Sequence, residues 1–200
     1  MSIESIKLLF EDSLAVKRRL VEGSELFKLA EMGEEAAERI LQGGKIMLCG
    51  NGGSAADAQH LAAELLVRLR PQNNREGIPA LALAQDTSTI TACGNDFGYD
   101  LLYERMVRAL GRNGDILIAI TTTGNSPNIV KALDAARDMG IRTFGFLGAG
   151  GGDALPLCDR SFIVPSDNTG RVQEAHITAG HALMETIENN LLASGYLSLN

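Results

Sequence analysis

Short apolar runs alternate with helical patterns along residues 45–193, and this alternation restricts the fold more than any other feature. The runs that suit buried strands are 45–49, 79–84, 115–120, 142–147 and 161–164, and the helical segments are 54–69, 88–110, 126–139 and 171–193. Strands that alternate with helices form parallel sheets covered on both faces. Residues 2–42 add two helices with a break at 22–24. We therefore predict one α/β domain over 1–200, with an N-terminal helical pair (1–43) and a five-stranded core (44–195).

Composition excludes several classes of protein. The formal net charge is −7, and no Lys/Arg cluster extends beyond residues 68–75, which argues against nucleic-acid binding. The start MSIESIKLLFEDS is acidic where a signal peptide is basic, and no apolar run is long enough to span a membrane, so we expect a cytoplasmic protein without membrane contact. Cys49, Cys93 and Cys158 are too scattered for a disulfide framework or a metal knuckle.

The first strand leads directly into a glycine-rich turn and a helix, in the stretch KIMLCGNGGSAADAQHLAAE at 45–64. Gly52 and Gly53 let the backbone approach a ligand, and Ser54 is predicted to cap the helix. Free amides at a helix N-terminus favour phosphate. The turn also satisfies the dinucleotide pattern G-x-G-x-x-A, but the ribose-binding acid expected about 20 residues later is missing, because no strand ends near Arg70.

The stretch ILIAITTTGNSPNIVKAL repeats this plan at the third strand. Its helix is predicted to begin with Ser126 as the cap and Pro127 at the first helical position, and residues 121–123 add three threonine hydroxyls. Small residues also serve tight turns without any ligand. Two such loops in one short chain favour a phosphate site instead.

Polar residues share one face of two helices. Asp57, His60, Glu64 and Arg68 recur at spacings of three or four, which suits either a solvated stripe or a metal held by the pair His60 and Glu64. The last helix carries Gln173 and the other two histidines, His176 and His181. These residues too suit either a solvated stripe or a site. Because the chain has only three histidines and all lie in segments that can face one sheet edge, we favour a site.

Four separated motifs, GNGGSAADAQH with AAEL, GNDFGYD, TTTGNSPN and RVQEAHITAGH, resemble the sedoheptulose-7-phosphate (phosphoheptose) isomerases over nearly the whole chain. These are cytoplasmic, single-module members of the sugar-isomerase (SIS) fold. The resemblance implies an aldose-ketose isomerase that makes D-glycero-D-manno-heptose 7-phosphate, the first step of ADP- or GDP-heptose biosynthesis for lipopolysaccharide or another glycoconjugate. It also implies a homotetramer with active sites between subunits, packed through residues 1–43.

The resemblance assigns roles by position. Substrate contacts fall on Asn51, Gly52, Gly53, Ser54, Glu64, Asn95, Asp96, Thr121, Thr122, Thr123, Ser126 and Gln173, among which Ser54, the threonines and Ser126 hold the phosphate. The resemblance also assigns the ligands of one zinc ion per subunit to His60, Glu64, Gln173 and His181. It assigns the acid/base pair to Glu64 and His181. His176 receives no role. Where the family usually has Ser-Thr-Ser-Gly, this chain has Thr-Thr-Thr-Gly at 121–124, which keeps the hydroxyls and adds methyl groups that alter the fit.

The expected chemistry is an enediol proton transfer, which needs a base above the carbon and an acid near the oxygens. Glu64 and His181 are the required types, and zinc would polarise the carbonyl, although a glutamate bound tightly to zinc is a poor base. Gln173 and His181 lie about 12 Å apart along one helix, so ligands from two chains are the easier geometry. The alternatives are a non-catalytic SIS protein that binds the replication initiator and a sugar-phosphate-sensing module. The former is expected to lack Glu64, which this chain retains.

Overall fold

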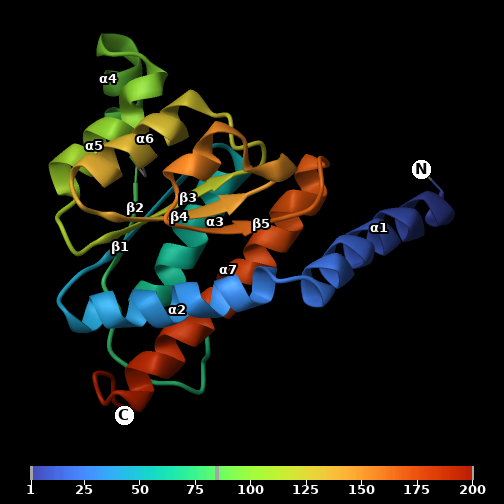
Figure 1. The fold of residues 1–200 in the computed structure, drawn as a ribbon, viewed down its shortest axis with the longest axis horizontal. Helices are drawn as coiled ribbons and strands as arrows, with labels where there is room; N and C mark the ends of the chain where they lie inside the picture. Colours follow the sequence, from blue (N-terminus) through green and yellow to red (C-terminus); the bar gives the residue numbers. More distant parts are fainter. Residues whose placement is uncertain (1, 84–85, 200) are drawn as a thin grey trace.

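The computed structural model of the chain describes residues 2–83 and 86–199. At its centre is one sheet of five parallel strands in the order β2-β1-β3-β4-β5 (Figure 1). The strands are β1 (Ile46–Gly50), β2 (Ala80–Ala82), β3 (Ile116–Thr121), β4 (Arg142–Leu147) and β5 (Arg160–Ile163). Every residue of β1 and β3 is buried, as expected for strands covered on both faces. The predicted α/β class is therefore confirmed, and residue 84 of the predicted second strand lies outside the described residues.

Helices cover both faces of the sheet (Figure 1). One face packs against α2 (Glu25–Leu41), α3 (Gly53–Ala63) and α7 (Thr169–Ala193), and the other packs mainly against α5 (Leu102–Leu110) and α6 (Pro127–Asp138). At the sequence level these helices show the apolar spacing of 3.6 residues that leaves one side for the core. The N-terminal helix α1 (Ile3–Glu22) extends away from this body, and its buried residues are Val16 and Leu20.

Two predicted helices are interrupted. The segment expected at 88–110 is divided into α4 (Thr87–Asp96), a 3-10 turn (η2, Tyr99–Leu101) and α5, because Gly98 takes a φ of 84° and ends the first helical path. The segment expected at 54–69 is α3 followed by a π-helical turn (η1, Glu64–Arg68). π turns are rare and often occur at functional sites. The segment predicted at 54–69 is therefore helical as expected, with a change to π geometry at Glu64, whereas the segment predicted at 88–110 is not one continuous helix.

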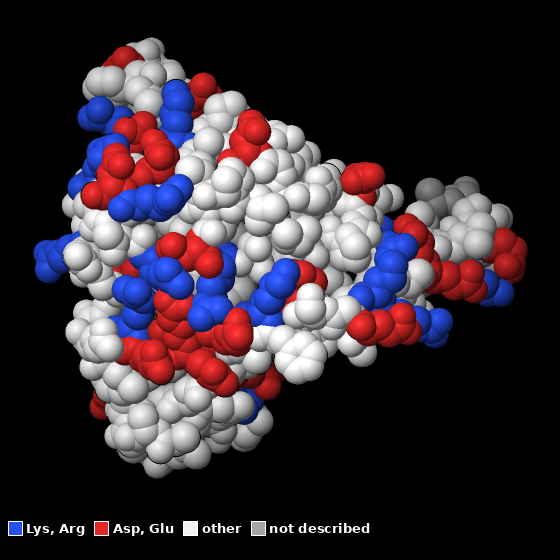
Figure 2. All heavy atoms as spheres, in the orientation of Figure 1, with Lys and Arg blue, Asp and Glu red and all other residues white. Residues whose placement is uncertain are grey.

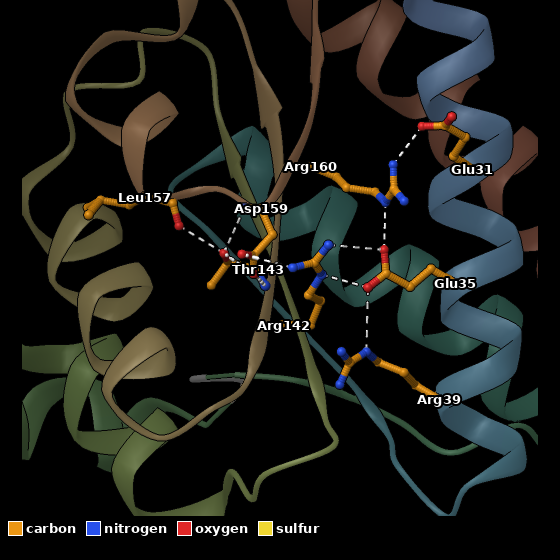
Figure 3. Close-up of polar contacts among 8 residues, drawn as sticks. All are labelled: Glu31, Glu35, Arg39, Arg142, Thr143, Leu157, Asp159 and Arg160. Carbon is orange, nitrogen blue, oxygen red and sulfur yellow. Dashed lines mark hydrogen bonds and ion pairs between the residues drawn. The ribbon is translucent and has the colours of Figure 1, made fainter.

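An ion-pair network among α2, β4 and β5 joins helix α2 to the sheet (Figure 3). The Glu35 carboxylate lies 2.5 Å from Arg142 Nε, 2.5 Å from Arg160 Nε and 3.6 Å from Arg39 Nε. Burial raises the pKa of Glu35, but hydrogen bonds from Arg160 and Arg142 outweigh burial and hold the pKa below its usual value. The stabilisation is therefore present at neutral pH and is lost as the pH falls through the folded-state pKa.

The surface is charged but mixed. On the face drawn in Figure 2, lysines and arginines are interspersed with aspartates and glutamates and do not gather into one basic area. Among residues 2–83 and 86–199, no helix has the length and apolar character needed to cross a bilayer. The three cysteines are free thiols, two of them buried.

Candidate active site

The first loop follows β1 and is held by its own backbone and by an asparagine pair. Gly52 takes a φ of 57° and caps α3, which begins at Gly53, so the prediction that Ser54 is the cap was wrong. Asn51 Nδ2 donates to Asn128 Oδ1 at 2.9 Å, and Asn128 Nδ2 donates to Asn51 Oδ1 at 2.8 Å. The Tyr99 hydroxyl also donates to Asn51 Oδ1, at 2.9 Å. These bonds fix Asn51 and join the first loop to α6.

Asn128 and Tyr99 were not predicted from the sequence as site residues, although they lie inside the motifs TTTGNSPN and GNDFGYD. Asn128 is 2% exposed at the second position of α6, and Tyr99 lies in the turn after Gly98. A buried asparagine must find hydrogen-bond partners, and its position next to Pro127 in TTTGNSPN was the available signal. Both residues form hydrogen bonds with the Asn51 side chain and thereby fix its orientation.

The second loop joins β3 to α6. Thr121 is 4% exposed, and its Oγ1 accepts from the Gly124 amide at 3.2 Å and lies 3.5 Å from Ser126 Oγ. Ser126 occupies the cap position before Pro127, as predicted, although its side chain makes no capping hydrogen bond. Thr123 Oγ1 accepts from the Asn125 amide at 3.2 Å. Two of the three threonine hydroxyls are thus engaged within the loop.

A cavity of about 140 Å³ lies between the two loops, where the N-termini of α3 and α6 meet. Its lining is polar apart from one isoleucine and consists of Asn51, Ser54, Ile120, Thr121, Thr122, Ser126, Thr169 and Gln173. Gln173 lies directly over the first loop, since a Cβ placed on Gly53 would be 2.2 Å from Gln173 Nε2. Amides, hydroxyls and two helix N-termini make this cavity suitable for an anion such as a phosphate group.

His60, Glu64 and His181 converge on one point between α3 and α7. His60 Nε2 is 2.8 Å from His181 Nε2 and 3.3 Å from Glu64 Oε1, and one ligand atom from each residue lies within 4.8 Å of the others. Two imidazole nitrogens and a carboxylate oxygen are ligands that zinc accepts. The donor set therefore fits the metal that the resemblance implies. Gln173, the fourth expected ligand, lies instead at the cavity, and the axial spacing between it and His181 is about 12 Å.

Two further residues of the predicted polar faces are Asp57 and His176. Asp57 lies one turn before His60, and its Oδ2 atom is buried without a hydrogen-bond partner among the described residues. Burial raises the pKa of the Asp57 carboxyl, while His60 and His181 act to lower it.

His176 is 1% exposed and packs on Phe146 with ring centroids 5.8 Å apart. Burial lowers the pKa of His176 to about 4, with the Leu147 carbonyl acting in the opposite direction. His176 is a core histidine, not part of a solvated stripe.

Asn95 and Asp96 lie apart from this assembly. They end α4, which stands at the tip of the molecule in Figure 1, and Asn95 Nδ2 donates to Asp96 Oδ1 at 2.7 Å. Both side chains are exposed and neither lines the cavity between the loops. The structure thus brings the two loops and Gln173 together, and separately the cluster of His60, Glu64 and His181.

Comparison with known proteins agrees with this geometry. The SIS domain family model matches residues 10–148. The chain is 48% identical to a phosphoheptose isomerase of Roseiflexus sp. over 181 residues, covering 90% of each protein. It is 54% identical to one of Paramagnetospirillum magneticum over 155 residues, covering 78% of this chain and 80% of the relative.

A solved structure gives the same result. The phosphoheptose isomerase GmhA from Neisseria gonorrhoeae superposes with a TM-score of 0.87 at 36% identity, covering 93% of this chain and 98% of that chain. The fold, the two loops and the cluster therefore occur in a sequence that is similar to phosphoheptose isomerases along most of its length. This chain belongs to the phosphoheptose isomerase family of SIS-domain proteins.

Proposed function

We propose that this chain interconverts sedoheptulose 7-phosphate and D-glycero-D-manno-heptose 7-phosphate. The observation that carries the proposal is the convergence of His60, Glu64 and His181 beside a cavity framed by two helix N-termini. The cavity and the cluster are separated by about two turns of α7, or about 12 Å, which is comparable to an extended seven-carbon sugar phosphate. The phosphate would occupy the cavity and C1 would lie at the cluster.

Phosphate binding in this arrangement positions the sugar without joining the chemistry. Ser54, Thr122 and Ser126 line the cavity, and the amides at the starts of α3 and α6 add further donors. Holding the phosphate at one end orients the reacting carbons at the other end, which lowers the entropic part of the barrier. Gln173 closes the cavity above the first loop.

Glu64 and His181 carry the proton transfers. Glu64, whose side chain is 15% exposed, takes a proton from C1 to form the enediol and returns it to C2. His181 moves a proton between the two substrate oxygens. A zinc ion held by His60, Glu64 and His181 would polarise the carbonyl and stabilise charge on the oxygens. Because this chain's own Gln173 lies at the cavity, the Gln173 that serves as a fourth ligand would come from another subunit. The non-catalytic alternative is not favoured, because the acid/base pair is present and converges.

We expect the purified protein to convert sedoheptulose 7-phosphate to the aldose, and we expect chelation to abolish this activity. Zinc added back should restore it, because two imidazoles and a carboxylate then regain their common ligand. The measurement is product formation by NMR alongside metal analysis, which should find about one zinc ion per chain. Magnesium serves as the control addition. A fully active, metal-free protein would contradict the metal assignment, and an inactive, zinc-loaded protein would contradict the reaction.

We also propose that the chain forms a homotetramer packed through α1 and α2. The supporting feature is apolar surface on the N-terminal helices, where Leu8 and Phe10 of the protruding α1 are 64% and 71% exposed and Phe27 of α2 is 77% exposed. Surface of this kind marks an interaction site, and the tetramer would place its active sites between subunits. Light scattering should give a mass about four times that of the chain. A monomer at micromolar concentration would contradict the proposal, and Phe10→Asp should weaken the assembly.

A further inference from the structure

The carbonyl oxygens at the end of the helix that carries Glu64 are held by one buried guanidinium. Arg75 Nη2 donates to the carbonyl of Glu64 at 2.9 Å, and Arg75 Nη1 donates to the carbonyl of Leu65 at 3.0 Å. The Ile78 amide donates to the Leu65 carbonyl as well, at 3.0 Å. The last carbonyls of a helix lack partners within it. External donors therefore set where the π turn η1 ends and how its first residue, Glu64, is placed.

The segment that carries Arg75 lies tightly against this turn. A Cβ added to Gly77 would be 2.7 Å from the Leu66 carbonyl oxygen. The segment 75–78 therefore contacts three successive carbonyls, those of residues 64 and 65 through the guanidinium and that of residue 66 through its backbone. Only a residue without a side chain permits this approach. The contact is between backbones and a guanidinium, and it leaves the Glu64 carboxylate free to face His60 at 3.3 Å.

Arg75 is in turn held by a buried carboxylate. The side chains of Arg75 and Glu188 are each 1% exposed, and Arg75 Nε is 3.0 Å from Glu188 Oε1. Glu188 also accepts from Asn73 Nδ2 at 3.0 Å and from Arg70 Nε at 3.1 Å. Charge-assisted hydrogen bonds in a site shielded from water are strong and directional. Glu188 therefore defines the position of Arg75.

Glu188 lies seven residues after His181 on α7, so the two share one face of that helix. We propose that Arg75 is a positioning residue for the isomerase, which links the backbone of Glu64 to α7 so that the Glu64 carboxylate and the His181 imidazole keep their mutual geometry. The inference rests on the proposed function for the chemistry of Glu64. The contacts by which Arg75 holds the π turn do not depend on that chemistry.

The test removes the link without leaving a buried charge. Replacing a buried ion pair with apolar residues of similar volume often preserves folding, so the variant is Arg75→Met combined with Glu188→Leu. We expect kcat to fall on the order of 10- to 100-fold, as for a small displacement of a catalytic group, with KM for the sugar phosphate little changed because other residues form the cavity. The affinity of the protein for zinc alone should fall by about 10-fold or more.

A conservative variant and a control distinguish positioning from general stability. Arg75→Lys keeps a charge opposite Glu188 but lacks the planar fork that reaches two carbonyls, so kcat and zinc affinity should still fall. Should the double variant fail to fold, this variant decides by the same readouts. Glu35→Gln weakens the network among α2, β4 and β5 and should lower the melting temperature while leaving kcat and zinc affinity unchanged.

Two results would overturn the proposal. One is unchanged kcat and zinc affinity in a folded Arg75 variant. The other is a Glu35→Gln protein that loses as much kcat as the Arg75 variants at a similar loss of melting temperature, because the effect would then be one of stability alone. If the parent protein isomerises no sugar phosphate but the Arg75 variants bind zinc more weakly, the proposed function fails and the positioning role stands.

Discussion

Glu64→Gln is expected to lower turnover by about 100-fold to 10,000-fold, the loss typical of a missing general base. Glutamine keeps the size and polarity of the side chain and an oxygen that can face His60, but it cannot accept the C1 proton. Because the cavity is formed by the loops after β1 and β3, substrate affinity should change little. The measurements are kcat and KM, together with exchange of the C1 proton into deuterated solvent, which should slow in parallel.

Two further variants sharpen this prediction. Glu185→Gln removes an exposed carboxylate from α7, 47% exposed beside Arg70, and should leave turnover unchanged. His181→Gln should retain some C1 exchange while net isomerisation stops, because the base remains whereas the proton shuttle and one zinc ligand are lost. A folded, zinc-loaded Glu64→Gln protein with nearly parental activity would remove Glu64 from the mechanism, and His181, the other acid/base candidate in the cluster, would become the candidate base.

Gly124→Ala is expected to disrupt the second loop and, with it, phosphate binding. Gly124 takes a φ of 73°, and a Cβ there would lie 1.9 Å from the Gly151 carbonyl oxygen, so both the backbone angle and the space oppose a side chain. We expect the free energy of unfolding to fall by about 2 to 4 kcal/mol. KM should rise on the order of 10-fold or more, the effect of losing one charge-assisted hydrogen bond. Urea denaturation and steady-state kinetics measure the two effects.

Gly150→Ala is the matched control. Gly150 has nearly the same angle, a φ of 78°, but no atom lies within 4 Å of an added Cβ. Only the left-handed conformation should then cost stability, about 1 to 2 kcal/mol, and KM should stay at the parental value. If both alanine variants behaved alike, the close approach of residues 124 and 151 would not be what holds the second loop in place.

Features encoded by neighbouring residues were predictable from the sequence. The strands appear as runs of apolar residues, the helices as 3.6-residue spacing, and the turns as glycine or Ser-Pro, so the parallel sheet and the place of both loops followed. His60 and Glu64 are four residues apart on a helical path, which put them on one face. The cap at Ser126 was predictable, whereas Ser54 was not distinguished from Gly52, because either residue type suits a helix start.

Long-range contacts decided the rest. The Glu64 carbonyl in the π turn accepts a hydrogen bond from Arg75, and Arg75 is paired with Glu188, which is 113 residues away in the chain. His176 is buried against Phe146 only because α7 packs on the sheet. Gln173 likewise lies against Gly53 only because α7 packs on the first loop.

The sequence by itself determined the layers of the fold, the two loops and the types of residue in the site, because these follow from local periodicity, turn chemistry and short motifs. Only the tertiary structure decided that His60, Glu64 and His181 meet at one point, that Gln173 lies at the cavity instead, and that a buried ion pair holds the helix end. The physical reason is that such contacts join segments whose separation in the chain carries no local pattern, and packing alone brings them together.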